Sequence, residues 1–249
     1  ETDGGLMPGP VFALPAGFLS LFGEAFNFVF FGREAETGGV NVGGTGQVID
    51  LATKQLEVTL LALAVTILLA MPVGLWLGHR QKGEFLAVSA GNAGRAIPEL
   101  ALIALMAAAI GVGLVNLVVA LAILGIPPIL TNTYVGISQV DRASVEAARG
   151  MGMTETGIVR KVELPLAVPT IMGGVRTAAI NIIATATIAP LAGILTLGDF
   201  IIARNVYGDA GVLAGAILVA LMALALEGTL AGIQWAMTSK GLRQQGRGA

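Results

Sequence analysis

Two ionisable side chains of opposite charge stand deep inside long apolar stretches of the sequence. Arg176 is the only charged residue between positions 164 and 198, and Glu227 is the only one between positions 210 and 239. Charged groups are costly inside a membrane and usually face a partner or a water-filled path. If each stretch is one helix rising about 1.5 Å per residue, the two residues lie about 12 and about 15 Å from the same end. We therefore expect an ion pair that fixes the packing of two helices or, alternatively, lines a path for a polar solute.

Six further residues in the apolar stretches are candidates for lining a polar path through the protein. They are helix-breaking or hydrogen-bonding residues: Pro127, Pro128, Thr131, Asn132, Asn181 and Thr185. Two consecutive prolines remove two backbone donors, so the helix that holds them should kink or break there. The threonine and asparagine that follow could satisfy the freed carbonyl groups or mark a transport site, as broken helices often do. The later asparagine and threonine could face the same path or serve as contacts between helices.

The other residues whose side chains could take part in chemistry are expected to have structural roles. Glu99 follows Arg95 by one helical turn, so these two should form an ion pair near the membrane surface. His79 is the only histidine, and no Asp, Glu or Cys stands near it at the spacing of metal ligands. The chain has no cysteine and no P-loop sequence, which excludes thiolate chemistry and nucleotide binding by that motif. We expect no catalytic residue, metal site or cofactor in this chain, and no nucleic acid partner.

One charged segment, VDRASVEAARGMGMTETGIVRKVELPLAVP at residues 140–169, is unlike a passive connector. Val145, Ala148 and Met151 recur at helical spacing, and Gly157 interrupts the pattern before it resumes. The pattern predicts two short helices at an angle, with small residues that let another surface approach closely. The segment would then be a rigid knob that binds a partner or, alternatively, an amphipathic linker that lies on the bilayer.

The elements that must position these residues are membrane-spanning helices. Of the 249 residues 55% are apolar and 12% charged, and the mean hydropathy is +0.83. This composition excludes a conventional soluble enzyme and a disordered chain. Stretches of about 20 apolar residues have the length that a helix needs to cross a hydrocarbon core of about 30 Å. We expect an all-α, polytopic bundle of about five transmembrane helices: about 56–77, two within 88–137 separated by a turn at 111–113, about 168–195, and about 212–237.

Positively charged residues set the expected orientation. With five spans, the loops at 80–95 and 141–163 and the tail after residue 238 share one side and carry ten lysines and arginines, against three on the other side. Because cytoplasmic loops are enriched in Lys and Arg, we expect a cytoplasmic C-terminus. From the N-terminus, we expect an extracytoplasmic or interfacial segment 1–52, a transmembrane domain 53–239 and a cytoplasmic tail 240–249.

The segment at residues 11–31 is apolar but rich in phenylalanine, and Pro15, Gly17, Gly23 and Glu24 interrupt it. The phenylalanine content favours a segment that lies at the membrane interface over a membrane span. A sixth span remains the alternative, and it would place the start of the chain inside the cell without changing the other helices.

The segment at residues 140–169 resembles the EAA loop of importer-type ABC permeases. That loop has the pattern Glu-Ala-Ala, three residues, Gly, nine residues, Ile, one residue and Leu-Pro. This chain matches the pattern, with valine in place of isoleucine, at Glu146, Ala147, Ala148, Gly152, Val162, Leu164 and Pro165. The resemblance implies the type I ABC importer fold. It also implies that residues 141–165 are a coupling loop, which docks on a separate ATPase subunit and transmits its closure to the pore.

Four segments narrow the resemblance to the permeases of glycine betaine, carnitine and choline uptake systems. They are RAIPELALIAL (95–105), GIPPILTNTYVGI (125–137), VDRASVEAARGMGMT (140–154) and GVRTAAINIIATATIA (174–189). The resemblance implies import of a quaternary ammonium osmoprotectant across a bacterial-type cell membrane, with ATP and Mg bound by a partner ATPase dimer. It further implies an extracytoplasmic substrate-binding protein, a second permease (identical or a sister subunit) and membrane lipid as partners. The alternatives are an ABC importer for amino acids or another small polar solute, and an ion-coupled secondary carrier.

Overall fold

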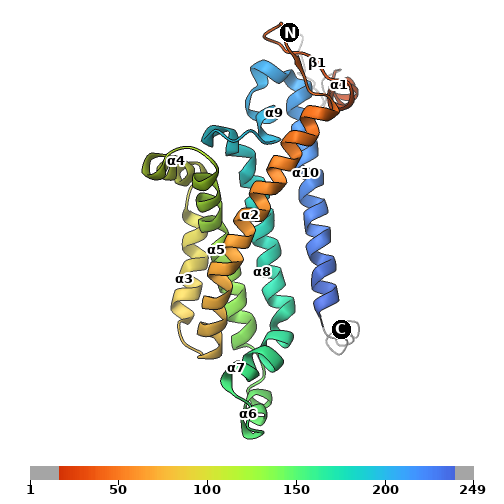
Figure 1. The fold of residues 1–249 in the computed structure, drawn as a ribbon. Helices are drawn as coiled ribbons and strands as arrows, with labels where there is room; N and C mark the ends of the chain where they lie inside the picture. Colours follow the sequence, from red (N-terminus) through yellow and green to blue (C-terminus); the bar gives the residue numbers. More distant parts are fainter. Residues whose placement is uncertain (1–16, 239–249) are drawn as a thin grey trace, which may run out of the picture.

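The computed structural model describes residues 17–238 and all their side chains except those of Phe18, Leu86, Val88, Ala90, Asn92, Ala93 and Arg95. Four helices of the described chain are long and apolar enough to cross a membrane, and they run lengthwise through the molecule (Figure 1). Their bounds are α2 Gly44–His79, α5 Leu114–Ser138, α8 Leu164–Thr185 and α10 Arg204–Met237. A π-helix, η1 (Val159–Glu163), leads into α8, and a 3-10 helix, η2 (Ala186–Ala192), continues it. Because α2 begins at Gly44, it reaches into the expected N-terminal segment 1–52.

The second of the five expected spans is instead two short helices, α3 (Glu84–Ala96) and α4 (Glu99–Ile110). A proline disfavours helical geometry at the residue before it, and Ile97, before Pro98, has the extended angles φ −78° and ψ 118°. At about 1.5 Å per residue, α3 and α4 are about 20 and about 18 Å long, each shorter than the hydrocarbon core. Figure 1 shows α4 turned away from the direction of α3. The expected basic loop at 80–95 is also shorter, because α3 begins at Glu84 and position 95 lies at its far end.

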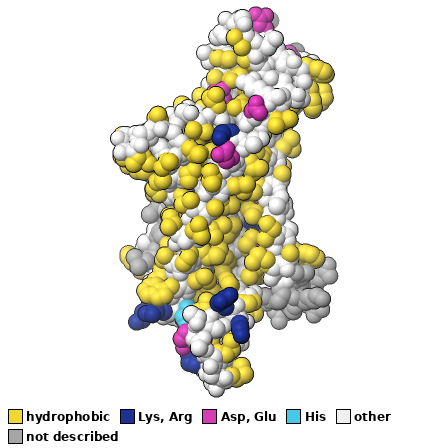
Figure 2. Space-filling model, viewed as in Figure 1, with side chains coloured by type: hydrophobic (Ala, Val, Ile, Leu, Met, Phe, Trp, Pro, Cys, Tyr) yellow, Lys and Arg dark blue, Asp and Glu magenta, His cyan; other side chains and the backbone are white. Residues whose placement is uncertain are grey.

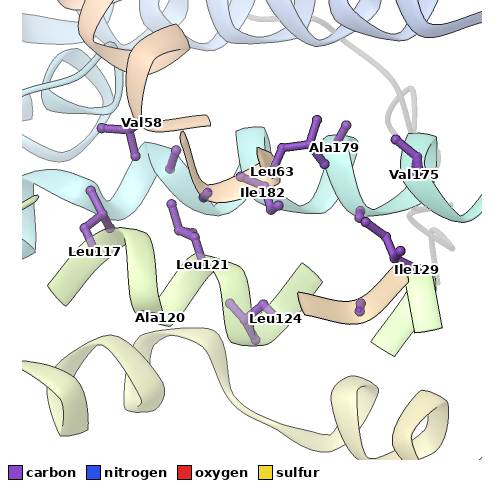
Figure 3. Packing of buried hydrophobic residues seen from close by; sticks show 14 of the residues in the cluster. Val58, Leu63, Leu117, Ala120, Leu121, Leu124, Ile129, Val175, Ala179 and Ile182 are labelled. Atoms are coloured by element: carbon purple, nitrogen blue, oxygen red, sulfur yellow. The ribbon is translucent and has the colours of Figure 1, made fainter. Parts of the chain in front are cut away.

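The core of the bundle lies between α2, α5 and α8 (Figure 3). Its side chains are apolar and buried, and they include Val58, Leu63, Leu117, Ala120, Leu121, Leu124, Ile129, Val175, Ala179 and Ile182. α10 packs against α8 and against two shorter helices, α1 (Phe18–Phe30) and α9 (Gly198–Ile202), and it leaves more of its surface exposed than α2, α5 or α8. α5 packs against α2, α3, α4 and α8, so neighbouring helices surround it.

Two short helices project from one end of the bundle, which we call the α6 end (Figure 1). They are α6 (Arg142–Gly150) and α7 (Glu155–Ile158), and they confirm the pair of short helices that the sequence predicts. Val140, Val145, Ala148 and Ile158 form a small buried cluster between them. The segment is therefore a folded knob that projects from the bundle, as the first of the two expectations has it.

The opposite end, the α1 end, is a compact cap (Figure 1). It contains α1 (Phe18–Phe30), the short antiparallel strands β1 (Arg33–Glu34) and β2 (Asn41–Val42), and α9 (Gly198–Ile202). Phe28, Phe200 and Tyr207 meet edge to face at its centre, with the Phe200 ring centroid 5.0 Å from Phe28 and 4.9 Å from Tyr207. The helix α1 is about 20 Å long, too short to cross a bilayer by itself. Residues 11–16 of the expected interfacial segment lie outside the described residues.

Apolar side chains cover the middle of the molecular surface, and lysines and arginines gather at the α6 end (Figure 2). The exposed apolar residues of α2 include Leu60, Leu61, Leu68 and Leu69. An apolar belt bounded by charge is the surface expected of a protein that spans a bilayer.

Candidate functional site

A polar hollow lies where α3, α4, α5 and α8 meet. Its volume is about 360 Å3. It is lined by Gly91, Gly94, Ile97, Glu99, Leu124, Pro127, Pro128, Thr131, Asn132, Thr177 and Asn181. We call it the proline hollow, because the two consecutive prolines of α5 form part of its wall.

The proline hollow brings together most of the residues that the sequence singles out for a path. Five of the six candidates line it: Pro127, Pro128, Thr131, Asn132 and Asn181. Thr185 does not line it, since its side chain is only 3% exposed and lies one turn further along α8. Arg176 and Glu227 are also absent from the wall, so the structure separates the ion pair from the hollow.

α5 continues through Pro127 and Pro128 as one helix, so the expected break does not occur. The helix is enclosed by α2, α3 and α8, and this packing holds it in place. Thr131 Oγ1 donates to the carbonyl oxygen of Ala87 at 2.8 Å, which ties α5 to α3. Asn132 Nδ2 donates to the carbonyl oxygen of Pro128 at 2.8 Å within α5. Both side chains therefore bind backbone groups while they line the hollow.

The close approach of α3 to α5 depends on glycine. A Cβ atom at Gly94 would lie 2.3 Å from Cγ of Pro127, a distance that no packing adjustment of a rigid ring could relieve. Small residues at such crossings let membrane helices approach closely. Gly94 therefore sets the position of the α3 wall of the hollow.

Glu99 gives the proline hollow its only charge among the described lining residues. The other polar groups of the wall are hydroxyls and side-chain amides, and no described Lys or Arg lines it. Oxygen acceptors and one carboxylate make a site that suits a cation and repels an anion. None of the described lining residues is aromatic, so these residues do not supply the ring faces that bind methylated cations most strongly.

Sequence reasoning missed Glu99 and Thr177 as lining residues. Glu99 stands out as the only charge in its apolar stretch, but its spacing from Arg95 favours a surface ion pair, and the Arg95 side chain lies outside the described ones. Thr177 precedes Asn181 by four residues, so both lie on one face of α8. That spacing is the signal that could have found it.

The expected contact between Arg176 and Glu227 is present and joins α8 to α10. Arg176 Nε donates to Glu227 Oε1 at 2.8 Å, and Arg176 Nη2 contacts the same oxygen. Arg176 Nη1 donates to Oε1 of Gln234 at 2.9 Å, a partner that the sequence did not suggest. The side chains of Arg176 and Glu227 are 32% and 26% exposed. This network fixes α10 against α8, which favours the structural interpretation of the pair.

Side-chain bonds fix the shape of the α6 knob. Asp141 caps α6 by accepting bonds from Ser144 and from the backbone of Ala143, and these bonds lower the pKa of the Asp141 carboxyl. Arg149 donates from Nε and Nη2 to the two carboxylate oxygens of Glu155, at 2.8 and 3.0 Å. This bidentate pair raises the pKa of Arg149 and braces α6 against α7.

The residues that match the loop pattern divide into buried and exposed ones. Ala148 is buried under α6, whereas Glu146 and Ala147 face outward. Glu146 makes no hydrogen bond to any described residue, so the Asp141 cap and the Arg149–Glu155 pair, and not Glu146, hold the loop in shape. Gly152 has φ +80°, a geometry that favours glycine, at the turn between the short helices. Val162 is half-buried at the end of η1, and Leu164 and Pro165 begin α8.

His79 connects the end of α2 to the knob, a contact that the sequence did not suggest. Its Nδ1 is 2.8 Å from Glu163 Oε2, and its Nε2 is 3.1 Å from Glu155 Oε2. The Glu163 residue is only 1% exposed, so His79 is its polar partner inside the protein. We call this contact the His79 bridge. The glutamates stand far from His79 in the sequence, so only the folded chain brings them together.

Comparison with known protein families gives a match over most of the chain. The sequence profile of the family described as "Binding-protein-dependent transport system inner membrane component" matches residues 70–243. The chain is 36% identical over 199 residues to the glycine betaine/carnitine/choline transport system permease protein OpuCB of Bacillus subtilis, covering 80% of this chain and 92% of that protein. It is 34% identical over 184 residues to the osmoprotectant import permease protein OsmY of Salmonella typhimurium, covering 73% and 78% of the two chains.

Solved structures of ABC transporters share the fold. A native crystal form of the MetNI methionine ABC transporter, in an inward-facing conformation, aligns with a TM-score of 0.68 at 22% identity over 78% of this chain and 98% of that one. An amino acid ABC transporter crystallised with histidines aligns with a TM-score of 0.59, also at 22% identity, over 77% and 94% of the two chains. At this level of identity the likeness concerns the fold alone.

Proposed function

Since the chain belongs to the family of binding-protein-dependent transport system inner membrane components, we propose that it imports a quaternary ammonium osmoprotectant as the permease of an ATP-driven transporter. Glycine betaine, choline and carnitine are the candidate cargoes. The observation that carries this proposal is the identity of 34–36% to permeases named for these solutes and for osmoprotectants, over 73–80% of this chain.

The proline hollow is the proposed binding site of the transported solute, the cargo, within the membrane. A quaternary ammonium group is a cation without N–H donors, so it needs negative charge nearby more than it needs directed hydrogen bonds. Glu99 supplies that charge, and Asn132, Thr177 and Asn181 supply neutral polar groups around it. Without an aromatic cage the hollow would hold the cargo weakly, which suits a path more than a storage site. Selectivity would then lie mainly in the substrate-binding protein.

The proposed partners follow from the two ends of the molecule. The exposed face of the knob, with Glu146, Ala147 and Met151, would dock on the ATPase dimer, which binds ATP and Mg. The α1 end would face the substrate-binding protein outside the cell. In this orientation the basic α6 end is cytoplasmic, as the excess of lysines and arginines there favours. This chain would carry no catalytic residue and no cofactor of its own.

A second permease is part of the proposal, because the described chain offers few spanning helices to enclose a path. α10 buries the smallest share of its apolar surface among the four long helices. Either an identical copy or a sister subunit would complete the wall.

Uptake by purified components tests the proposal. The permease would be reconstituted into liposomes with its ATPase and binding protein, and ATP-dependent entry of radiolabelled choline and glycine betaine would be measured. We expect Glu99→Gln to lower choline uptake about tenfold at low concentration, because it removes the charge that faces the cation in a low-dielectric site. Glu99→Asp should keep part of the activity.

Glu57→Gln is the matched control, since Glu57 is an exposed carboxylate on α2 outside the hollow. Equal choline uptake by Glu99→Gln and the unaltered protein would contradict the role of the hollow. Uptake that persists without ATP and stops with ionophores would indicate a secondary carrier. Uptake of amino acids in place of quaternary ammonium compounds would contradict the proposed cargo.

A further inference from the structure

A second hollow lies at the α6 end, between the last turns of α2 and the segment formed by α7 and η1. Its volume is about 680 Å3. One wall is apolar and is formed by Pro72, Leu75, Trp76 and Val159. The hollow is separate from the proline hollow and shares no lining residue with it. We call it the arginine groove, after the cations that line its other side.

Two of the cations in the arginine groove are not neutralised by any described residue. Arg149 is paired with Glu155, and Glu155 also contacts His79. Arg80 and Arg160 line the groove, are exposed, and form no ion pair within residues 17–238. The groove therefore carries an excess of positive charge.

Trp76 places the groove at the depth of lipid headgroups. Tryptophan is enriched where a membrane meets water, and Trp76 is 55% exposed. The guanidinium of Arg80 lies 4.8 Å from the centre of its ring, in a cation–π contact. On the side away from the knob, the groove continues into the exposed apolar face of α2, which includes Leu69 and Val73.

We propose that the arginine groove binds an anionic phospholipid of the leaflet at the α6 end. Arg80 and Arg160 contact the acidic headgroup, and Pro72, Leu75 and Val159 contact the first carbons of an acyl chain. A net negative lipid is favoured over a zwitterionic one, because two positive charges lack a partner and an anion at this depth supplies it. A lipid is favoured over a protein surface, because the apolar wall is continuous with the face of α2 that meets the bilayer.

A bound lipid would connect two elements that the transport cycle moves. Trp76 and Arg80 belong to α2, whereas Arg160 belongs to η1, between the knob and α8. The lipid would therefore lie beside the His79 bridge and strengthen the same junction. Uptake by the reconstituted transporter should then depend on anionic lipid.

Tryptophan fluorescence provides the test. In a Trp235→Phe background Trp76 is the only tryptophan, and the full-length permease would be placed in nanodiscs with brominated lipids that quench it. Brominated phosphatidylglycerol would be compared with brominated phosphatidylcholine. We expect phosphatidylglycerol to bind preferentially, with a preference of about fivefold for each of the two arginines. Arg80→Ala with Arg160→Ala should bring the preference close to one.

The matched control removes the same charge from the same end. Lys82 and Arg142 are exposed and do not line the groove, so Lys82→Ala with Arg142→Ala should keep most of the preference. Equal losses in the two double variants would mean general attraction to a charged surface and would overturn the site. Absence of any preference in the unaltered chain would also overturn it. The quenching of Trp76 should persist after the ATPase is added. Loss of the quenching would mean that the ATPase, and not a lipid, occupies the arginine groove.

Discussion

Gly152 and Glu146 occupy nearby positions in the knob, yet they contribute to it by different physical means. Gly152 adopts φ +80°, which an L side chain rarely adopts, while the space around it is open. Its requirement is therefore conformational and not steric. Glu146 is exposed and forms no hydrogen bond with the described residues, and we propose that it contacts the partner that approaches the knob. Gly152 therefore sets the shape of the exposed surface of the knob, and Glu146 is part of that surface.

Gly152→Ala should weaken binding of the ATPase, whereas Gly150→Ala should not. A left-handed geometry costs a residue with a side chain about 1–2 kcal/mol, which lowers the equilibrium constant for forming this turn about five- to thirtyfold. Gly150 is equally exposed but ends α6 with ordinary helical geometry, so alanine is tolerated there. Co-purification of the ATPase with each variant measures the difference. Equal retention by both variants would show that the turn does not set the docking surface.

Arg176 and Glu227 should show strong coupling in a double-mutant cycle. Removing one partner leaves a charge inside the membrane, and removing both avoids that cost, so the double variant should be milder than the sum of the single ones. Thermal stability in detergent would be measured for Arg176→Met, Glu227→Leu and the combination. Strictly additive losses would show that the pair does not stabilise the packing of α8 and α10.

Proline has opposite outcomes in two helices of this protein, and the difference comes from packing. Pro98 follows an extended residue and separates α3 from α4, at the periphery of the bundle. Pro127 and Pro128 lie within α5, which α2, α3 and α8 enclose, and that helix remains continuous. We expected a kink or break only at Pro127 and Pro128. The extended residue before Pro98 follows the local rule for residues that precede proline, whereas the packing around α5 keeps that helix continuous, and a single sequence does not show this packing.

The helices and the ion pair could be predicted because each depends on local pattern. The length of the apolar stretches indicated the four long helices, and similar depth indicated that Arg176 and Glu227 are partners. The His79 bridge could not be predicted, since it joins α2 to residues more than seventy positions away. Five of the six path candidates meet in one hollow, but Glu99 joins them only because α3 and α4 form separate helices. The pattern of apolar residues along the sequence does not determine where a helix breaks or which distant residues come into contact.

The His79 bridge should transmit movement of the knob to α2. His79→Ala removes the polar partner of the buried Glu163 carboxylate and separates α2 from η1. We expect lower thermal stability and less solute transported for each ATP hydrolysed. Gln81→Ala is the control, because Gln81 also lies just beyond α2 but donates only to backbone oxygens. If His79→Ala transports as much solute for each ATP hydrolysed as the unaltered protein, the His79 bridge has a structural role only.

In the molecule as a whole, the charge and the hydropathy of the surface vary along the long axis of the bundle. The apolar belt lies between a basic α6 end and the α1 cap (Figure 2). The profile match and the curated relatives confirm the family that the loop pattern indicated, and the structural neighbours confirm the fold. Four helices are long enough to cross a membrane by themselves, and two shorter helices, α3 and α4, stand in place of the fifth expected span and change direction at Pro98. The chain nevertheless crosses from one end to the other along α3 and α4, so the expected sides of the later segments are retained.

Cysteine labelling in intact cells tests this orientation. The chain has no native cysteine, so a single introduced one is the only reactive thiol. Thr45, exposed in the first turn of α2, lies toward the α1 end, whereas Met151, 77% exposed, lies at the tip of the knob. Because basic segments are retained in the cytoplasm, a membrane-impermeant maleimide should label Thr45→Cys in intact cells and Met151→Cys only after lysis. Labelling of Met151→Cys from outside would show that the molecule has the opposite orientation. The knob would then lie outside the cell, where no ATPase could bind it, and it could not couple ATP hydrolysis to uptake.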